Sequence, residues 1–358
     1  MIRIERPCRL TTALPRPPSS GIRRQARHLH LAPPFLLDDY VPRYQMLGTR
    51  EAALKRSKAY AHLRNCNLCP RLCGVNRYQT TGMCLIGDKA KNSQFCFGDT
   101  ETCIQGHNGS GAVFMSGCNL RCVFCQNHDI SHQRNGMDLT PEELGDWYLK
   151  LQTVGNVHNI NIVTPEHVVP QVALSILHAR ELGLNVPIVY NTSSFDSLAS
   201  LELMDGLVDI YLADFKVWEP ATSKRLLKSD DYAATAKESV KAMHAQVGDL
   251  CFTGDGIAKQ GLLIRHLVMP GREREGVEIM RYLASEVSKD CFVNIMEQYS
   301  PRAHVGKTRR GKAGIGEVRY GDINRPVNES EVTSVREAAE AAGLWRFNEP
   351  PKHDGFAI

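Results

Sequence analysis

The chain has no long hydrophobic run. Its longest apolar stretches are interrupted by charges or prolines, and none approaches the roughly 18 apolar residues that a transmembrane helix requires. Outside residues 1–34, the chain also lacks an excess of positive charge, because 36 basic residues stand against 38 acidic ones. The sequence after residue 34 is therefore not basic enough to neutralise the phosphate backbone of a nucleic acid. We therefore expect a soluble protein that binds neither a membrane nor a nucleic acid.

Residues 1–34 differ in composition from the rest. They hold seven arginines but only one acidic residue, Glu5, and they lack the apolar core of a secretory signal. This composition is typical of an organelle transit peptide, although it also fits a plain basic tail. The sequence therefore predicts a mitochondrial protein if the segment is a transit peptide, and a cytoplasmic one otherwise.

The twelve cysteines are unevenly distributed. Seven of them form two tight groups, Cys66, Cys69, Cys73 and Cys84 in the first, and Cys118, Cys122 and Cys125 in the second. Because the chain is long and shows no export signal, a disulfide framework is not expected. Such clustering favours metal binding.

From residue 111 onward, short β-branched runs alternate with helical patterns. The expected strands are 111–117, 159–163, 186–192, 208–216, 261–271 and 291–296, and the expected helices are 140–154, 166–183, 195–204, 231–248 and 273–288. This alternation predicts parallel pairing through right-handed crossovers. Six units fall short of a full barrel, so we predict an α/β fold, a partial (β/α)6 open barrel with an N-terminal Cys-rich cap.

The predicted organisation has four parts. Residues 1–34 are the basic segment, 35–110 the Cys-rich cap, 111–305 the partial barrel, and 306–358 a C-terminal extension with a helix near 329–343. In such folds chemistry lies at the carboxyl ends of the strands. We therefore expect the polar residues that follow each strand to converge on one rim of the barrel.

The loop "GCNLRCVFCQN" has the spacing C-x3-C-x2-C directly after the first barrel strand. Thiolates this close together can approach different irons of one cubane cluster, and three ligands leave the fourth iron open for a substrate. A zinc knuckle is the alternative. No fourth thiol follows within ordinary reach, which favours the open [4Fe–4S] cluster.

The sequence resembles the radical S-adenosylmethionine (radical SAM) enzymes, whose signature is C-x3-C-x-aromatic-C. Cys118, Cys122, Phe124 and Cys125 match it position by position. Over roughly residues 62–305 the blocks "CNLCPRLCGVNR", "SGCNLRCVFCQN", "NTS", "DFK" and "VMPG" resemble those of pyruvate formate-lyase activating enzymes and their homologues. The resemblance implies that S-adenosylmethionine binds the open iron and is cleaved to a 5′-deoxyadenosyl radical.

The resemblance also implies a set of cofactor contacts. Thr164 and Glu166 hold the place of the family's Gly-Gly-Glu stretch, and Pro165 between them has no N–H to donate. Glu166 could instead be the first-turn acid of the following helix. Beside Phe124, the other implied contacts are Asn191, Thr192, Asp214, Lys216 and His304. Lys216 could instead be a solvated surface lysine, and His304 an exposed loop histidine.

One of the adjacent Arg265 and His266 should face the cofactor, and the other should lie under a helix. The resemblance further implies that Thr192 and Asp214 help to hold a monovalent cation. Asn191 should weaken the binding of this cation, because it replaces an acidic ligand.

The upstream group, with the spacing C-x2-C-x3-C-x10-C, provides four thiols that can close a site for zinc or for a second iron–sulfur cluster. It could also remain metal-free, because the spacing of the cysteines alone does not determine whether zinc, a cluster or no metal is bound.

We expect an activating-enzyme-like oxidoreductase that abstracts hydrogen from a polypeptide and receives its electron from a donor such as a flavodoxin or ferredoxin. The alternatives are radical SAM chemistry on a small molecule and a non-catalytic iron–sulfur electron carrier.

Overall fold

The computed structural model describes residues 32–98, 101–309 and 316–348. The predicted basic segment therefore lies almost entirely outside the described residues. No helix within the described ranges is long and apolar enough to cross a bilayer.

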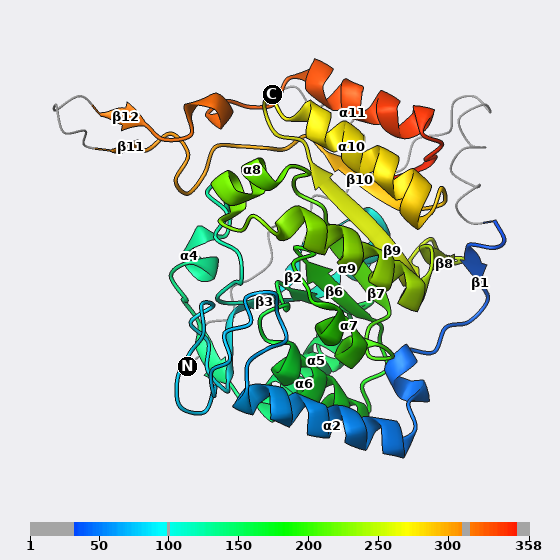
Figure 1. The fold of residues 1–358 in the computed structure, drawn as a ribbon. Helices are drawn as coiled ribbons and strands as arrows, with labels where there is room; N and C mark the ends of the chain where they lie inside the picture. The colour runs from blue at the N-terminus through cyan, green and yellow to red at the C-terminus, as the bar shows by residue number, and fades with distance from the viewer. Residues whose placement is uncertain (1–31, 99–100, 310–315, 349–358) are drawn as a thin grey trace, which may run out of the picture.

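Parallel strands form the centre of the molecule (Figure 1). Hydrogen bonding orders them β3-β5-β6-β7-β9-β10, and every neighbouring pair in this series is parallel. Their bounds are β3 Ser110–Met115, β5 Ile160–Val163, β6 Ile188–Thr192, β7 Ile210–Asp214, β9 Ala258–Leu267 and β10 Phe292–Met296. All the expected strands are confirmed, with ends that differ by a few residues.

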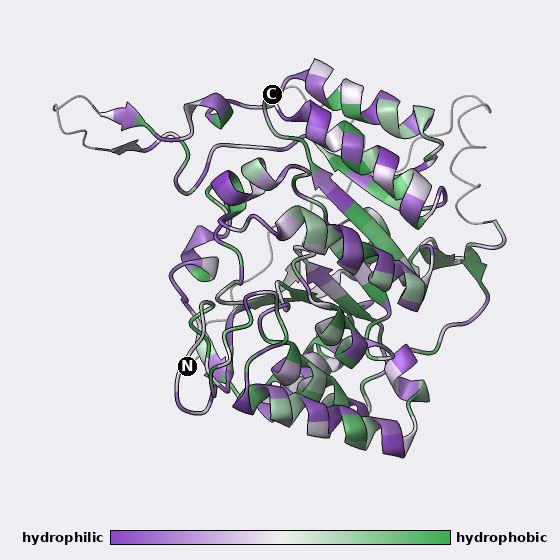
Figure 2. Cartoon of the chain, viewed as in Figure 1, coloured by the Kyte–Doolittle hydropathy of each residue, from purple (hydrophilic) through white to green (hydrophobic). Residues whose placement is uncertain are grey.

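Helices connect these strands and cover the sheet. They are α5 Pro141–Thr153, α6 Val169–Glu181, α7 Leu198–Met204, α9 Tyr232–Val247 and α10 Glu273–Tyr282, the last extended by a π-helical turn, η3 Leu283–Val287. Helix α5 begins with a capping box, because Thr140 Oγ1 accepts from Glu143 N and Glu143 Oε2 accepts from Thr140 N. Figure 2 shows purple and green bands on the helices, as expected where one face packs on a sheet and the other meets solvent.

The barrel is open. Within the described part of the chain, β3 does not pair with β10; its free edge is taken by the antiparallel strand β2 Ala90–Gly98, and β10 pairs on its outer side with β13 Arg346–Phe347. The predicted partial barrel is confirmed. Strand β2 also pairs with β4 Met137–Leu139.

The region before β3 is built onto the barrel. Its longest helix, α2 Thr49–Arg64, packs against α6 and was not predicted (Figure 1). Strand β1 Leu36–Leu37 pairs with β8 Cys251–Thr253, which in turn pairs with β9. The short elements here and beside β3 are η1 Arg43–Met46, α3 Thr102–Gln105 and α4 His128–Ser131.

The remaining elements lie toward the C-terminal part of the chain. They are α8 Pro220–Thr222, η2 Ser223–Leu227, the antiparallel pair β11 Thr308–Arg309 and β12 Glu317–Val318, η4 Gly321–Ile323, and α11 Glu329–Ala341. The expected helix near 329–343 is α11, which packs on α10 (Figure 1).

Candidate active site

The cysteine loop begins where β3 ends. Gly117, with φ +82°, turns the chain, and a Cβ there would meet Cys84 O at 2.8 Å, so glycine is required. Leu120 N donates to Cys118 Sγ at 3.3 Å. Cys118 is buried, whereas Cys122 and Cys125 are half-buried, so the triplet extends from the interior toward the surface.

The three thiols are near neighbours. Burial raises the pKa of Cys118 well above its usual value, and Glu166 and Cys122 raise it further. Burial likewise raises the pKa of Cys122 to about 12, although the Lys216 cation opposes the rise and Cys125 adds to it. The loop, Glu166 and Lys216 are therefore within electrostatic reach of one another. The predicted convergence on one rim is confirmed for these groups.

A charged group stands at the carboxyl ends of β6, β7 and β9. Arg265 Nε donates to Asp214 Oδ1 at 2.7 Å, and Lys216 Nζ donates to Asp214 Oδ2 at 2.6 Å. Arg265 Nη2 donates to Asn191 Oδ1 at 2.8 Å. Burial alone would raise the pKa of Asp214, but the two cations outweigh burial and hold the pKa below its usual value. Lys216 is thus a half-buried, paired lysine, and its interpretation as a solvated surface residue was wrong.

Arg265 is the residue of its pair that faces the rim, as expected for one of the two. His266 points the other way, because its Nδ1 bonds to Phe215 O at 2.8 Å and a Cβ on Gly276 of α10 would meet its Nε2 at 2.7 Å. Glu101 completes the charged group, 3.6 Å from Arg265 Nη1. Sequence reasoning missed Glu101, since nothing local marks it and only the packing of α3 against β9 brings it here.

Glu166 is buried at the carboxyl end of β5. Its Oε1 accepts from Ser193 N at 3.2 Å and from Ser193 Oγ at 2.5 Å, while its Oε2 has no hydrogen-bond partner in the described residues. Helix α6 begins only at Val169 and has no acid in its first turn, so the interpretation of Glu166 as a helix-terminal acid was wrong. Thr164 beside it has φ +60°, and Thr164 N donates to Asn191 O at 2.8 Å.

A second carboxyl group stands near Glu166. Thr192 Oγ1 donates to Asp196 Oδ2 at 2.5 Å, and Tyr190 OH donates to Asp196 Oδ1 at 2.7 Å. Burial raises the pKa of Asp196 to about 6, and burial together with Asp196 raises the pKa of Glu166 to about 7. Thr192 is therefore engaged with Asp196.

This raised pKa predicts how stability depends on pH. An acid whose folded pKa lies above its unfolded value of about 4.3 stabilises the fold most below that value, and the contribution is lost as pH rises toward 7. We expect Glu166→Gln, whose amide does not ionise, to lose less stability between pH 5 and pH 8 than the wild type. Urea midpoints at both values test this. Glu142→Gln, on the exposed start of α5, is the control, and an unchanged loss in Glu166→Gln would contradict the expectation.

The other predicted contacts also lie by the loop. Phe124 is buried, with its ring centroid 6.2 Å from that of Tyr299. His304 N donates to Val123 O at 2.9 Å, which fixes the histidine against the cysteine loop. Its ring stands 5.1 Å from that of His128, so it is not an isolated loop histidine.

Two of the upstream cysteines, Cys66 and Cys84, contact one buried arginine. Arg77 Nε donates to Cys66 Sγ at 3.1 Å, Arg77 Nη2 donates to Cys84 Sγ at 3.7 Å, and Met83 N donates to Cys73 Sγ at 3.4 Å. Burial raises the pKa of Cys69 to about 12, and the other three thiols of the group add to the rise. The group is therefore gathered, and Arg77 is a neighbour that sequence reasoning missed.

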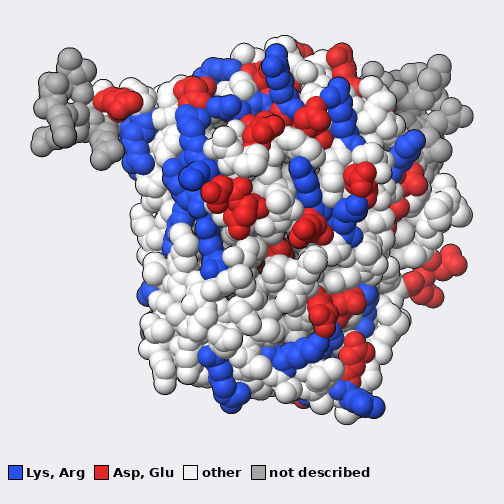
Figure 3. All heavy atoms as spheres, in the orientation of Figure 1, with Lys and Arg blue, Asp and Glu red and all other residues white. Residues whose placement is uncertain are grey.

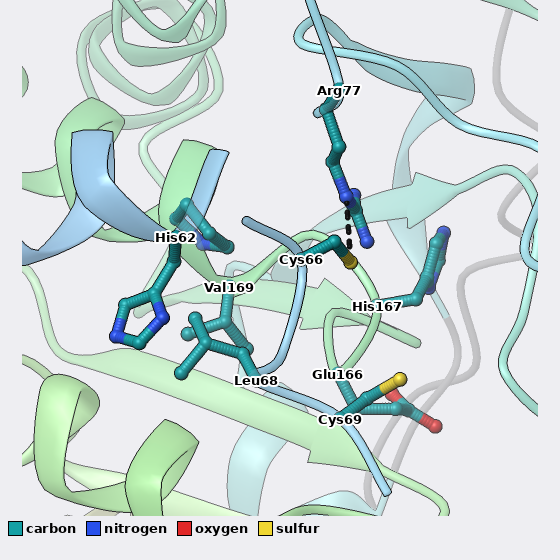
Figure 4. Close-up of a pocket in the computed structure, with 9 residues that line it drawn as sticks. His62, Cys66, Leu68, Cys69, Arg77, Glu166, His167 and Val169 are labelled. Carbon is teal, nitrogen blue, oxygen red and sulfur yellow. Dashed lines mark hydrogen bonds between the residues drawn. The ribbon is translucent and has the colours of Figure 1, made fainter. Parts of the chain in front are cut away.

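This upstream group adjoins the rim. Cys66, Cys69 and Arg77 line a small cavity together with Glu166 and His167 (Figure 4). Glu166, which is also within electrostatic reach of Cys118, therefore adjoins both cysteine groups.

Residues 112–282 match the family model of the radical SAM superfamily. This stretch belongs to that superfamily. Membership implies a [4Fe–4S] cluster and S-adenosylmethionine. A relative is an uncharacterized protein of Methanocaldococcus jannaschii, 28% identical over 294 residues that cover 78% of this chain and 76% of that protein.

Two solved structures are similar to part of this chain. Streptococcus suis SuiB bound to S-adenosylmethionine gives a TM-score of 0.42 at 10% identity, covering 66% of this chain and 48% of that chain. Native anSMEcpe with bound AdoMet gives 0.39 at 12% identity, covering 65% of this chain and 61% of that chain. The chain described here thus spans about half the length of SuiB.

The residues present fit the implied cluster. Cys118, Cys122 and Cys125 are free thiols on one loop. No set of three or more His, Cys, Asp or Glu side chains in the described ranges is arranged to hold a single metal ion. Cluster ligands bind separate irons, so the three thiols need not converge on one point.

Proposed function

We propose that this radical SAM protein uses Cys118, Cys122 and Cys125 to hold a [4Fe–4S] cluster and abstracts hydrogen from a polypeptide, as an activating-enzyme-like oxidoreductase does. The observation that carries the proposal is the free cysteine triplet at the end of β3, beside the Asp214–Lys216–Arg265 group. Bound there, the reduced cluster supplies the electron that cleaves S-adenosylmethionine to a 5′-deoxyadenosyl radical.

The residues on the rim have complementary charges for the methionyl end of this cofactor. Lys216 and Arg265 are cations held by Asp214, and they suit a carboxylate. The unpartnered Oε2 of Glu166 suits an ammonium group, because a carboxylate oxygen accepts the hydrogen bonds that an ammonium donates. Asn191 links the two groups, since its carbonyl accepts from Thr164 N and its Oδ1 accepts from Arg265 Nη2. His304, which lies against the cysteine loop, is proposed to contact the ribose, and Phe124 within the loop is proposed as a further cofactor contact.

The contacts of Asp214 give less support to a monovalent cation at Asn191, Thr192 and Asp214. Both oxygens of Asp214 already accept hydrogen bonds from Arg265 and Lys216, so positive charge is in place without an ion.

The decisive experiment is anaerobic reconstitution with iron and sulfide, reduction with dithionite, and analysis of the products. The proposal predicts 5′-deoxyadenosine from S-adenosylmethionine. Its absence from a fully reconstituted sample would favour the non-catalytic electron carrier. Isotope transfer from a deuterated peptide into 5′-deoxyadenosine would support the polypeptide substrate, and transfer only from a small molecule would favour the alternative.

Cys66, Cys69, Cys73 and Cys84 are proposed to hold a separate metal, either zinc or a second cluster; a single zinc ion would require the four thiols to move closer together, since no such set in the described residues is arranged to hold one metal ion. N–H groups of Arg77 and Met83 are directed at the sulfur atoms of Cys66, Cys73 and Cys84, an arrangement that also suits metal-bound thiolates. None of these four cysteines belongs to the loop that carries Cys118.

We therefore expect the Cys118→Ala, Cys122→Ala, Cys125→Ala triple variant to retain metal. About four irons and four sulfides per chain would identify a second [4Fe–4S] cluster, and about one zinc would identify a knuckle. Elemental analysis after anaerobic purification makes the measurement. Finding neither metal would show that the upstream thiols are structural.

A further inference from the structure

Cationic side chains gather on one side of the molecule, where α8 and the β11–β12 pair lie. Figure 3 shows this concentration of blue at the upper left. Arg225, Lys228 and Arg319 place their charges 5.5, 5.3 and 5.5 Å from the centre of the Tyr320 ring. Lys307 belongs to the same group, since burial together with Arg319, Lys307 and Lys228 lowers the pKa of His304. We call Arg225, Lys228, Lys307 and Arg319 the basic face.

The basic face is attached directly to the cysteine loop. Arg121 N donates to Leu227 O at 3.1 Å and Val123 N donates to Leu226 O at 2.9 Å, which ties the loop to the η2 turn just before Lys228. On the other side, His304 N donates to Val123 O at 2.9 Å, three residues before Lys307. Both segments that carry the face therefore bond to the residues between Cys118 and Cys125.

Much of the positive charge is available to a partner. Arg225 is paired with Asp322 and contributes little. None of the ion pairs found in the described residues includes Lys228, Lys307 or Arg319. Lys228 and Lys307 are exposed, and Cys125 nearby is only half-buried. The basic face thus brings cations without ion-pair partners close to the half-buried Cys125.

We propose that the basic face docks an acidic protein that donates one electron to the cluster. The inference rests on the proposed function, in which the cluster must gain one electron and the carrier must lose one. An acidic carrier suits the charge of the face, and charge complementarity accelerates the encounter of such transient partners. The face is local, and residues beyond position 34 have a slight excess of acids, so an extended nucleic acid is a poorer match.

The test uses the Lys228→Glu, Lys307→Glu double variant of the full chain, with an acidic bacterial flavodoxin as the probe. Titration calorimetry at low salt should show flavodoxin affinity at least about tenfold weaker than for the wild type, or about 1.4 kcal/mol. Flavodoxin-driven 5′-deoxyadenosine formation should fall about 10- to 100-fold, whereas dithionite-driven formation should stay within about twofold. Neither changed residue belongs to the proposed cofactor site.

Arg50→Glu is the matched control. It makes the same change of charge at the exposed start of α2, far from the basic face (Figure 1), where an acid also suits the helix terminus. It should leave both flavodoxin affinity and flavodoxin-driven turnover at the wild-type level.

Several outcomes would overturn the proposal. Wild-type flavodoxin affinity in the double variant would do so, and so would an equal loss in Arg50→Glu. Unchanged flavodoxin binding with lost affinity for a DNA duplex would instead assign the face to nucleic acid. If the reconstituted wild type makes no 5′-deoxyadenosine with dithionite, the proposed function fails, while the calorimetry still decides docking.

Discussion

Replacing Cys122 by alanine is expected to abolish cleavage of S-adenosylmethionine. Cys122 is the central thiol of the triplet and stands beside Lys216, at the point where the loop meets the charged rim. Two thiolates cannot hold the cluster that three are needed to bind, so no site remains at which the cofactor is reduced. Production of 5′-deoxyadenosine should fall to the background of the assay, at least about 1000-fold below the wild type. The measurement is chromatography of anaerobic reactions.

Cys251→Ser provides the control for this variant. Cys251 is also half-buried, but it belongs to neither cysteine group and its Sγ–H donates to Asp249 O at 3.3 Å, a bond that a hydroxyl can replace. Its activity and iron content should match the wild type. Undiminished cleavage by Cys122→Ala would remove the triplet from the mechanism.

Replacing Asp214 by asparagine is expected to lower the free energy of unfolding by about 3–5 kcal/mol, because it leaves two cations without their shared carboxylate. The side chains of Asp214, Arg265 and Lys216 are 16%, 19% and 21% exposed, so water compensates them poorly. The lowered pKa of Asp214 sets the pH dependence. Its contribution is present above the unfolded pKa of about 3.9 and is lost as pH falls through the lower folded value. Urea unfolding should therefore show the full difference at pH 7 and a smaller one near pH 3.

Asp322→Asn tests whether burial is the cause. Asp322 also contacts two arginines, Arg225 and Arg272, but its side chain is 43% exposed. Exposed ion pairs contribute about 0–1 kcal/mol, so this variant should lose little. Equal losses in the two variants would contradict the argument from burial.

The periodicity of the sequence was sufficient to predict the barrel. Alternation of β-branched runs with predicted helices of 10 to 18 residues leaves parallel pairing through crossovers as the arrangement that buries both faces of the sheet. The same alternation predicted which residues lie on the rim, because residues just after parallel strands meet at one edge of the sheet. Cys118, Glu166 and Lys216 were predicted to meet there on this ground, and they do. Loop spacing likewise identified the triplet, since three thiols within eight positions need no tertiary contact to lie close.

Tertiary structure alone decided which partners these residues have. Arg265 could face either side of β9, and only the packing of α10 on His266 turns it to Asp214. Arg77 and Glu101 carry no local signal, because a buried charge is recognisable only from the opposite charges or thiols that distant segments bring to it. Glu166 was ambiguous between a helix terminus and the rim until α6 was seen to begin at Val169. The sequence by itself determined the succession of strands and helices in the barrel and the chemistry of the loop, because both follow from local patterns of residues. The charges around the loop depend on contacts between residues far apart in the chain, which only the folded structure specifies.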